Sequence, residues 1–266
     1  MAEPMFLEEV DDHGVARLVL NRPEVHNAFN DVLIAELTSA LKRLEQDPKV
    51  RAVLLAAEGK SFSAGADLNW MKRMAGYSEE ENRADARGLA GLMRTLNDLT
   101  KPTIALVQGA AYGGGVGLVA CCDIAIAATR AGFCLSEVKL GLIPAVISPY
   151  VVAAIGARAA RRYFVTAERF DAEAALRLGL VQEVVAPEEL EAAGRRVLDA
   201  LLAGGPEAQA AAKRLVRDTA GRQIDDALVE ETAKRIAAVR AGAEAREGVS
   251  AFLEKRPPAW PGARQG

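Results

Sequence analysis

The chain has 266 residues, of which 50% are apolar and 26% are charged, and its formal net charge is −3. This is a globular composition, long enough for one large core or two smaller ones. Basic residues are scattered apart from short clusters such as Arg158–Arg162, so nothing indicates a nucleic-acid surface. No apolar run reaches the roughly 18 residues of a membrane span, and the N-terminus lacks a signal-peptide pattern. We therefore expect a cytoplasmic protein, or an organelle-matrix protein after processing, without membrane contact.

The three cysteines, Cys121, Cys122 and Cys134, all lie in apolar surroundings. Their number is odd, two are adjacent and no C-x-x-C spacing occurs, which indicates buried free thiols. With only His13 and His26 to complement them, we predict no metal site. A cysteine nucleophile with a histidine base stays open by count, but neither histidine is near the glycine-rich stretches.

The first 100 residues predict alternating strands and helices. Strands at 5–10 and 15–20 flank the turn Asp11–Gly14 and form a hairpin. A helix begins after Asn27 or Asn30 and runs to about residue 46, because either asparagine can cap it. A buried strand at 50–56 and a loop at 58–66 follow. Ser78 and Glu81 then form the capping box of a helix that ends near Leu99.

The rest of the chain changes from mixed to helical. The expected elements are a strand at 103–107, a glycine-rich loop, a very short helix, strands at 123–128 and 133–137, a helix from Ser148 and a strand at 181–185. Helices at 187–202, 206–219, 224–241 and 243–253 follow. This predicts an α/β core over residues 1–195 and a C-terminal helical subdomain over 196–266. These helices have few large apolar residues, so we expect them to pack on the core or on another subunit.

Two stretches rich in small residues follow buried strands. In Ser61–Leu68, a glycine and small side chains let backbone N–H groups approach a ligand, and Asp67 can cap the next helix. Taken on its own, this stretch is better explained as a plain strand-to-helix turn. In Gln108–Gly117, three consecutive glycines indicate N–H groups that point at an anion or a developing oxyanion. A packed glycine turn is the alternative.

A dinucleotide fingerprint is the other reading of the glycine turn, since Gly115–Ala120 fits G-x-G-x-x-A. Five residues separate Val107 from Gly113, whereas the fingerprint follows its strand directly. Only about seven residues then remain before the next strand, fewer than a parallel crossover needs. The spacing therefore argues against a dinucleotide site.

Glu137 lies in the apolar stretch Phe133–Pro144. Burial there would raise its pKa and suit it to proton transfer near pH 7. Taken alone, a glutamate at a strand end is as well explained by an exposed or ion-paired residue.

Together, these stretches resemble the enoyl-CoA hydratase/isomerase (crotonase) superfamily. The motifs are A-G-A-D-L at 64–68, a G-G-G turn about 45 residues later that leads into C-D-I-A-I-A, and S-E-V-K-L-G-L-I-P at 136–144. Leu20–Ala28 and Ala251–Arg256 also match, so the resemblance covers nearly the whole chain. It implies a crotonase-like spiral of ββα units, a C-terminal helical trimerisation region, and a homotrimer or homohexamer (dimer of trimers).

The resemblance also implies residue roles. The backbone N–H groups of Ala66 and Gly114 would form an oxyanion hole for the thioester carbonyl, and Glu137 would be the acid/base. Coenzyme A would be part of the substrate, with no separate cofactor and no metal. The residues expected to contact the acyl-CoA are Ala64, Asp67, Leu68, Gly117, Tyr150, Phe252 and Lys255, of which the last two would reach the CoA nucleotide, often from a neighbouring subunit.

One departure concerns the attacking water. Hydratases of the family have two glutamates, and Gly117 stands where the first is expected. Backbone groups of the glycine turn, the Tyr150 hydroxyl or a carboxylate on the substrate could then hold the water. The segment Leu140–Tyr150 most resembles the bacterial methylglutaconyl-CoA hydratase branch linked to leucine breakdown, whose substrate carries a second carboxylate.

The sequence therefore predicts hydration or dehydration of an enoyl-CoA, including a branched or carboxylated one. Three alternatives stay open. They are an enoyl-CoA isomerase with Glu137 as its single proton shuttle, a catalytically inert CoA-binding member of the family, and an NAD-binding oxidoreductase.

Overall fold

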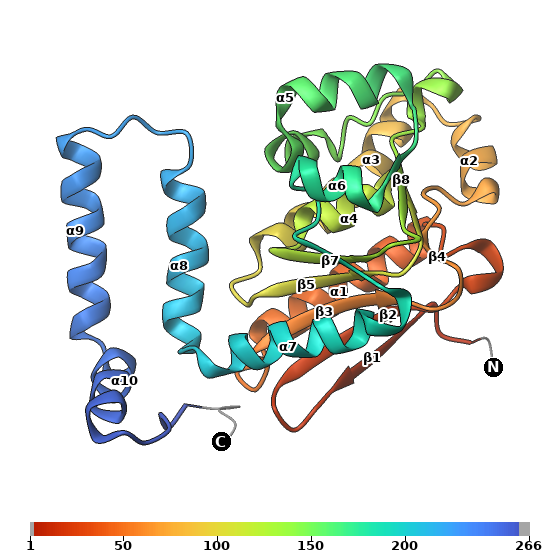
Figure 1. The fold of residues 1–266 in the computed structure, drawn as a ribbon. Coiled ribbons are helices and arrows are strands. Elements are labelled where there is room, and N and C mark those ends of the chain that lie inside the picture. Colours follow the sequence, from red (N-terminus) through yellow and green to blue (C-terminus); the bar gives the residue numbers. More distant parts are fainter. Residues whose placement is uncertain (1–2, 261–266) are drawn as a thin grey trace.

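The computed structural model describes residues 3–260, which form two β-sheets, the helices around them and a separate group of helices (Figure 1). The ends of the two predicted domains, residues 1–2 and 261–266, lie outside the described residues. Within the described part, no helix is long and apolar enough to cross a membrane.

The larger sheet has six strands in the order β1-β2-β3-β5-β7-β10. β1 is antiparallel to β2, and every other neighbouring pair is parallel. All six strands are predicted from the sequence, with bounds that shift by at most two residues. They are β1 (Phe6–Val10), β2 (Val15–Leu20), β3 (Ala52–Ala57), β5 (Thr103–Val107), β7 (Ile124–Ala128) and β10 (Glu183–Val185).

Both faces of this sheet are buried, which explains why its strands are almost continuously apolar. In β2, Leu18 faces one core while Val19 faces the other, and the neighbouring strands alternate in the same way. The helices α1 (Asp31–Gln46), α3 (Glu79–Asp98) and α4 (Gly114–Cys121) supply the larger core. The helix α7 (Leu190–Ala203) covers the opposite face (Figure 1).

A second sheet of four short strands has the order β4-β6-β8-β9. Its strands are β4 (Ser61–Ser63), β6 (Ala110–Tyr112), β8 (Gly132–Cys134) and β9 (Phe170–Asp171). β4, β6 and β8 each follow one strand of the larger sheet, namely β3, β5 and β7, and each leads into helical structure. This repeated strand–strand–helix path confirms the predicted spiral of ββα units.

The short strands account for two corrections. The predicted loop at 58–66 contains β4, and the predicted strand at 133–137 ends at Cys134. Glu137 instead begins the 3₁₀ helix η2 (Glu137–Leu140). Strands of two or three residues are too short to show a period of two, so the sequence carries little sign of them.

The remaining elements of the core surround these sheets. They are η1 (Pro23–Val25), α2 (Leu68–Met74), α5 (Ser148–Thr166), α6 (Ala172–Leu178) and η3 (Pro187–Glu189). α5 is kinked at Gly156, whose φ is +75°. Asn30 is the cap of α1, which decides between the two asparagines that the sequence offers.

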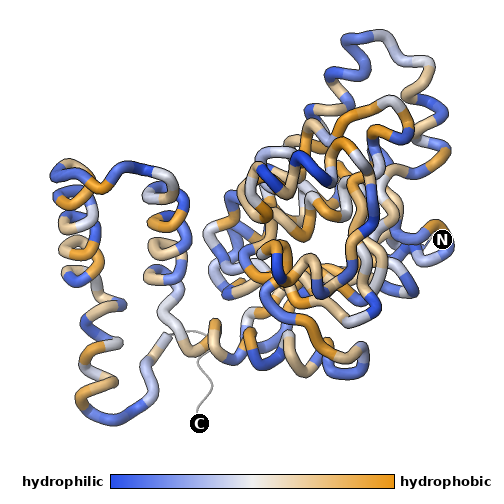
Figure 2. The backbone as a smooth tube through the Cα atoms, turned by 45° about the horizontal axis from the view of Figure 1, so that its top comes forward, coloured by the Kyte–Doolittle hydropathy of each residue, from blue (hydrophilic) through white to orange (hydrophobic). Residues whose placement is uncertain are grey.

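The last three helices, α8 (Pro206–Thr219), α9 (Asp226–Ala241) and α10 (Ala243–Glu254), form an arm beside the core (Figure 1). The Lys213 ammonium on α8 reaches Asp123 at 2.7 Å and so ties the arm to the core. The predicted domain boundary at 195 falls inside α7. Because α7 packs on the sheet, the arm begins with α8. Apolar residues recur along the arm (Figure 2), and several are exposed.

Candidate active site

The glycine turn before α4 is held in a conformation that only glycine adopts readily. Gly113 has φ +50° and ψ −116°. Its N–H donates to the carbonyl of Cys134 at 2.9 Å, so the turn is tied to the end of β8. α4 begins at Gly114, and the first amides of a helix have no partner within it. The turn therefore presents N–H groups where a ligand oxygen could lie.

Glu137 lies directly against this turn. A β-carbon on Gly113 would be only 3.1 Å from Oε1 of Glu137. Oε2 is buried and has no hydrogen-bond partner among the described residues. Burial raises the pKa of the Glu137 carboxyl, and no neighbouring charge contributes to the shift. The group is therefore suited to exchange a proton with a ligand held at the turn.

The segment Ala64–Leu68 bends at Gly65, whose φ is +89°, and enters α2 at Leu68. Ala64, Ala66 and Leu68 are exposed, while Gly65 and Asp67 are buried. Phe29 forms a parallel bridge with Ala66, because its N–H donates to Gly65 and its carbonyl accepts from Asp67, both at 2.7 Å. In such a bridge the N–H of the central residue points away from the partner. The Ala66 amide is therefore turned away from Phe29.

Phe29 also joins this segment to the glycine turn. A β-carbon on Gly114 would lie 2.9 Å from its ring, and one on Gly65 would lie 3.1 Å from the carbonyl oxygen of Tyr112. A side chain at Gly114 would press on this ring, and one at Gly65 would be strained as well because its φ is +89°. These close approaches bring Ala66, Gly114 and Glu137 into one region, although these residues are far apart in the sequence.

Asp67 is engaged in contacts with its own chain. Its carboxylate caps α2 by accepting from the amides of Asn69 and Trp70, as predicted. It also pairs with Arg22 at 3.0 Å. Burial raises the pKa of Asp67, but these hydrogen bonds and the Arg22 charge outweigh burial and hold it below its usual value. Its exposed neighbours Ala64 and Leu68 are freer to meet a ligand.

Gly117 is tightly packed on the side where a side chain would project, and its contact with the acyl-CoA stays a prediction. A β-carbon there would overlap Cγ2 of Ile147 and come within 3.2 Å of Cε of Met93. Gly117 lies one helical turn beyond Gly113, on the same side of α4. Glu137 covers that side at Gly113, and Ile147 covers it at Gly117.

Three other predicted residues lie on α5 and on the arm. Burial raises the pKa of the Tyr150 hydroxyl on α5, and the neighbouring Cys121 and Asp98 raise it further. Cys121 ends α4, at the opposite end from the glycine turn. Phe252, 81% exposed, and Lys255, which ends α10, are on the arm. Within one chain, Phe252 and Lys255 are therefore on a different part of the molecule from Glu137.

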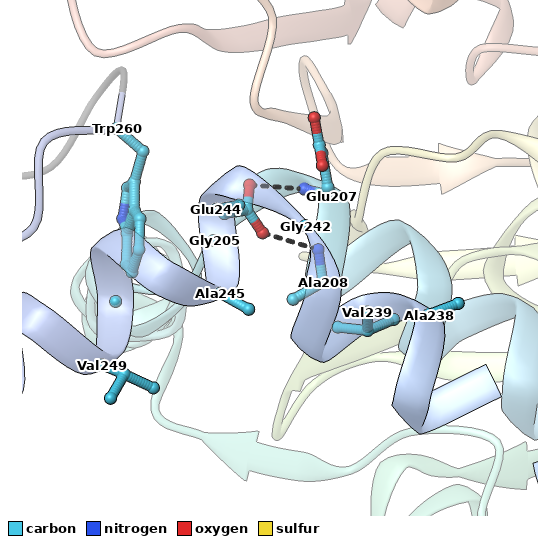
Figure 3. Close-up of a pocket in the computed structure, with 11 residues that line it drawn as sticks. Gly205, Glu207, Ala208, Ala238, Val239, Gly242, Glu244, Ala245, Val249 and Trp260 are labelled. Carbon is cyan, nitrogen blue, oxygen red and sulfur yellow. Dashed lines mark hydrogen bonds between the residues drawn. The ribbon is translucent and has the colours of Figure 1, made fainter. Parts of the chain in front are cut away.

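The arm has a cavity of about 520 Å³ between the start of α8, the end of α9 and α10 (Figure 3). Its lining is mainly small or apolar, with Trp260 on one side. The Glu244 carboxylate accepts from the amides of Glu207 and Ala208 and so caps α8. The cavity contains none of the residues expected to carry chemistry.

Three residues of this region were not singled out from the sequence. Phe29 supplies the bridge, Ile147 fills the space beside Gly117, and Arg22 pairs with Asp67. Arg22 and Ile147 lie in the matching stretches Leu20–Ala28 and Leu140–Tyr150, whereas Phe29 follows directly after the first of them. The roles of Phe29 and Ile147 depend on contacts between distant segments, which local patterns do not show.

The comparisons with known proteins agree with this geometry. The family model for enoyl-CoA hydratase/isomerase matches residues 11–263. The crystal structure of an enoyl-CoA hydratase from Shewanella pealeana is 49% identical, with a TM-score of 0.93, over 97% of this chain and 96% of that one. The crotonyl-CoA hydratase of Syntrophomonas wolfei is 34% identical over 96% of both chains. A trans-2-decenoyl-acyl-carrier-protein isomerase of Streptococcus mutans is 33% identical over 94% of this chain and 96% of that protein.

These matches span nearly the whole length of the chain and include both the core and the arm. The spiral of ββα units is the fold that its structural neighbours share. The chain therefore belongs to the enoyl-CoA hydratase/isomerase (crotonase) family.

Proposed function

We propose that this protein catalyses the reversible hydration of an enoyl-CoA thioester, with Glu137 as acid and base. The Glu137 carboxyl group lies against the glycine turn, with Oε2 buried and without a hydrogen-bond partner among the described residues, and this observation carries the proposal. A carboxyl group with a raised pKa holds and releases a proton closer to neutral pH. The wide match to hydratases supports the same reaction.

The amides of Ala66 and Gly114 are proposed to bind the thioester oxygen. Hydrogen bonds to this oxygen strengthen as it takes on enolate charge, and the positive end of α4 adds to the effect. Water then adds its oxygen to C3 and gives a proton to Glu137, while C2 receives a proton from the same carboxyl group. The C2–C3 double bond becomes a single bond with a hydroxyl group at C3.

For the substrate, we propose an acyl group with a second carboxylate, as in methylglutaconyl-CoA. The position where hydratases of the family carry their first glutamate is Gly117 in this chain. Ile147 and Met93 take up the space beside Gly117. A carboxylate on the substrate would supply the missing acceptor.

A second candidate is the isomerisation of a 3-enoyl-CoA to a 2-enoyl-CoA. This reaction needs one group that removes a proton from C2 and returns it to C4, and the single Glu137 carboxyl would be sufficient. The relative named a trans-2-decenoyl-acyl-carrier-protein isomerase supports an isomerase as the second candidate.

We also propose that the protein works as a homotrimer or a homohexamer. The exposed apolar residues of the arm support this assembly, as does the position of Phe252 and Lys255 at the end of α10, a helix that Figure 1 shows beside the core. A neighbouring protomer would then place these two residues at the CoA nucleotide.

A panel of enoyl-CoA thioesters followed at 260–280 nm tests the reaction. It should contain straight, branched and carboxylated 2-enoyl-CoAs together with 3-enoyl-CoAs. We expect loss of the conjugated absorbance, fastest with a carboxylated substrate. A gain of absorbance from 3-enoyl-CoAs alone would identify the isomerase, and no change with any member would contradict both proposals.

A further inference from the structure

Arg22 joins the two backbone segments that meet at the Phe29–Ala66 bridge. Its Nη1 donates to the carbonyl of Ala28 at 2.6 Å, and its Nη2 donates to Oδ2 of Asp67 at 3.0 Å. One partner directly precedes Phe29 and the other directly follows Ala66. A single planar guanidinium group therefore holds both sides of the bridge.

We call the contacts of Arg22 with Ala28 and Asp67 the Arg22 clamp, and its ion pair is shielded from water. The Arg22 side chain is 15% exposed and the Asp67 side chain 9%. An ion pair in such a place is screened less by salt, and removal of one partner leaves an uncompensated charge. Exposed ion pairs of the chain, such as Arg83 with Glu79 on α3, are screened by salt and leave no buried charge when one partner is removed.

Asp67, which is held by Arg22, fixes the backbone on both of its sides. Its Oδ1 accepts from the amides of Asn69 and Trp70 at 2.8 and 3.3 Å, which fixes the start of α2. Its own N–H donates to the carbonyl of Phe29 and completes the bridge. The backbone on both sides of Ala66 is thereby restrained.

The turn that carries Arg22 is itself anchored. The Arg22 N–H donates to Oδ1 of Asn27, and Nδ2 of Asn27 donates to the carbonyls of Glu58 and Ser61. Asn27 has φ +54°, a left-handed conformation that asparagine tolerates better than most residues. The backbone that carries the guanidinium group is therefore fixed beside β4.

We propose that Arg22 is a positioning residue that aims the Ala66 amide at the thioester oxygen by clamping Ala28 and Asp67 on the two sides of the bridge. This rests on the proposed function, in which that amide stabilises the enolate. Arg22 touches no reacting atom and acts only through the backbone that it fixes.

Arg22→Gln should lower kcat by about 10²-fold with KM little changed, because a small misplacement of a catalytic group can cost that much. Arg22→Lys should recover part of the loss, since an ammonium group keeps the charge but lacks the planar fork that meets both acceptors. Asp67→Asn keeps a capping side chain and loses the charge. Its effect and that of Arg22→Gln should not add, because both remove one interaction.

A second readout needs no turnover. Acetoacetyl-CoA ionises to an enolate with a distinct ultraviolet absorbance, and an oxyanion site raises the fraction of bound ligand in that form. The wild type should bind the enolate, and Arg22→Gln should bind acetoacetyl-CoA with a smaller enolate fraction at the same pH. Purely structural damage would lower binding as a whole and leave the enolate fraction of the remaining complex unchanged.

Arg17→Gln is the matched control, because Arg17 also pairs with a carboxylate, Glu191, at 2.6 Å, but on the other side of the sheet. It should leave kcat and the enolate fraction unchanged. If folded Arg22→Gln keeps both at the wild-type level, the positioning role is wrong. If Arg22→Gln fails to fold, Arg22→Lys and Asp67→Asn decide by the same two readouts.

The two readouts separate this inference from the proposed reaction. A wild type that turns over no enoyl-CoA but shows an Arg22-dependent enolate would support the clamp and refute the reaction. Turnover without any effect of the Arg22 variants would refute the clamp alone. A wild type that binds no enolate would refute the clamp, whatever its turnover.

Discussion

At the scale of single residues, catalysis and stability make opposite demands on Glu137. Its side chain is half-buried, Oε2 is buried without a partner among the described residues, and burial raises the pKa of the carboxyl group. A carboxyl group whose folded-state pKa exceeds the unfolded one stabilises the fold most below the unfolded pKa, about 4.3. This stability is lost as the pH rises through the folded pKa. At neutral pH the ionised group therefore destabilises the protein.

Glu137→Gln should lower kcat by about 10²–10⁴-fold, the usual contribution of a general acid or base. The same change should raise Tm at pH 7, and the gain should shrink as the pH falls toward 4, because the wild-type carboxyl is then protonated as well. Thermal melts between pH 4 and 8 measure this. Glu36→Gln, at an exposed position on α1, is the control and should change neither quantity. Near-wild-type turnover of Glu137→Gln would show that Glu137 is not the acid and base.

Gly113→Ala tests the turn that holds Glu137. The φ of +50° with ψ of −116° strains any other residue, and the new β-carbon would press on Oε1 of Glu137. Such backbone strain costs about 1–3 kcal/mol. We expect lower stability in urea titrations and lower kcat. Gly132→Ala should be harmless, because a β-carbon there meets nothing within 4 Å. Equal stability and equal kcat of the two variants would contradict the predicted strain at Gly113.

At the scale of elements, the sequence predicted those whose signals are local. The leucines of α1, from Leu33 to Leu44, are buried along one face, and Ser78 with Glu81 caps α3. The short strand β6 and the 3₁₀ start at Glu137 were missed, because two or three residues give no periodicity. The packing of Ile147 on Gly117 joins α5 to α4, and Arg22 meets Asp67 across 45 positions. Such contacts follow from the fold, so no local pattern shows them.

The packing of α4 against the start of α5 predicts the outcome of restoring a glutamate at position 117. Gly117→Glu should destabilise the protein by at least the roughly 1–3 kcal/mol of an overpacked core, because the side chain would collide with Ile147. Ile147→Gly removes the obstacle. The double variant should therefore be more stable than the sum of the single effects by about 0.5–3 kcal/mol in a urea-denaturation cycle. Additive effects would show that the two positions do not compete for space.

At the scale of the whole molecule, the arm exposes apolar side chains that a lone chain leaves in water. Phe252 is 81% exposed and Leu253 is 73% exposed. Adjacent exposed apolar residues of this size are typical of an interface. Together with the remote position of Lys255, they agree with the proposed assembly.

Sedimentation velocity should find the wild type as a trimer or a hexamer. Leu253→Glu should shift the distribution toward smaller species, because burying its charge in an interface is unfavourable. Val32→Glu, on the exposed side of α1, is the control and should leave the distribution unchanged. A monomeric wild type, or a Leu253→Glu variant that assembles normally, would contradict an interface at this end of the arm.

The most direct test of the central claim follows the proton that Glu137 delivers to C2. A 2-enoyl-CoA should be incubated with the enzyme in D₂O and its product analysed by mass spectrometry and NMR. We predict a 3-hydroxyacyl-CoA with one deuterium at C2, formed by the wild type and at least about 10²-fold more slowly by Glu137→Gln. Product without deuterium at C2, or equal rates of labelling by the two proteins, would contradict the account.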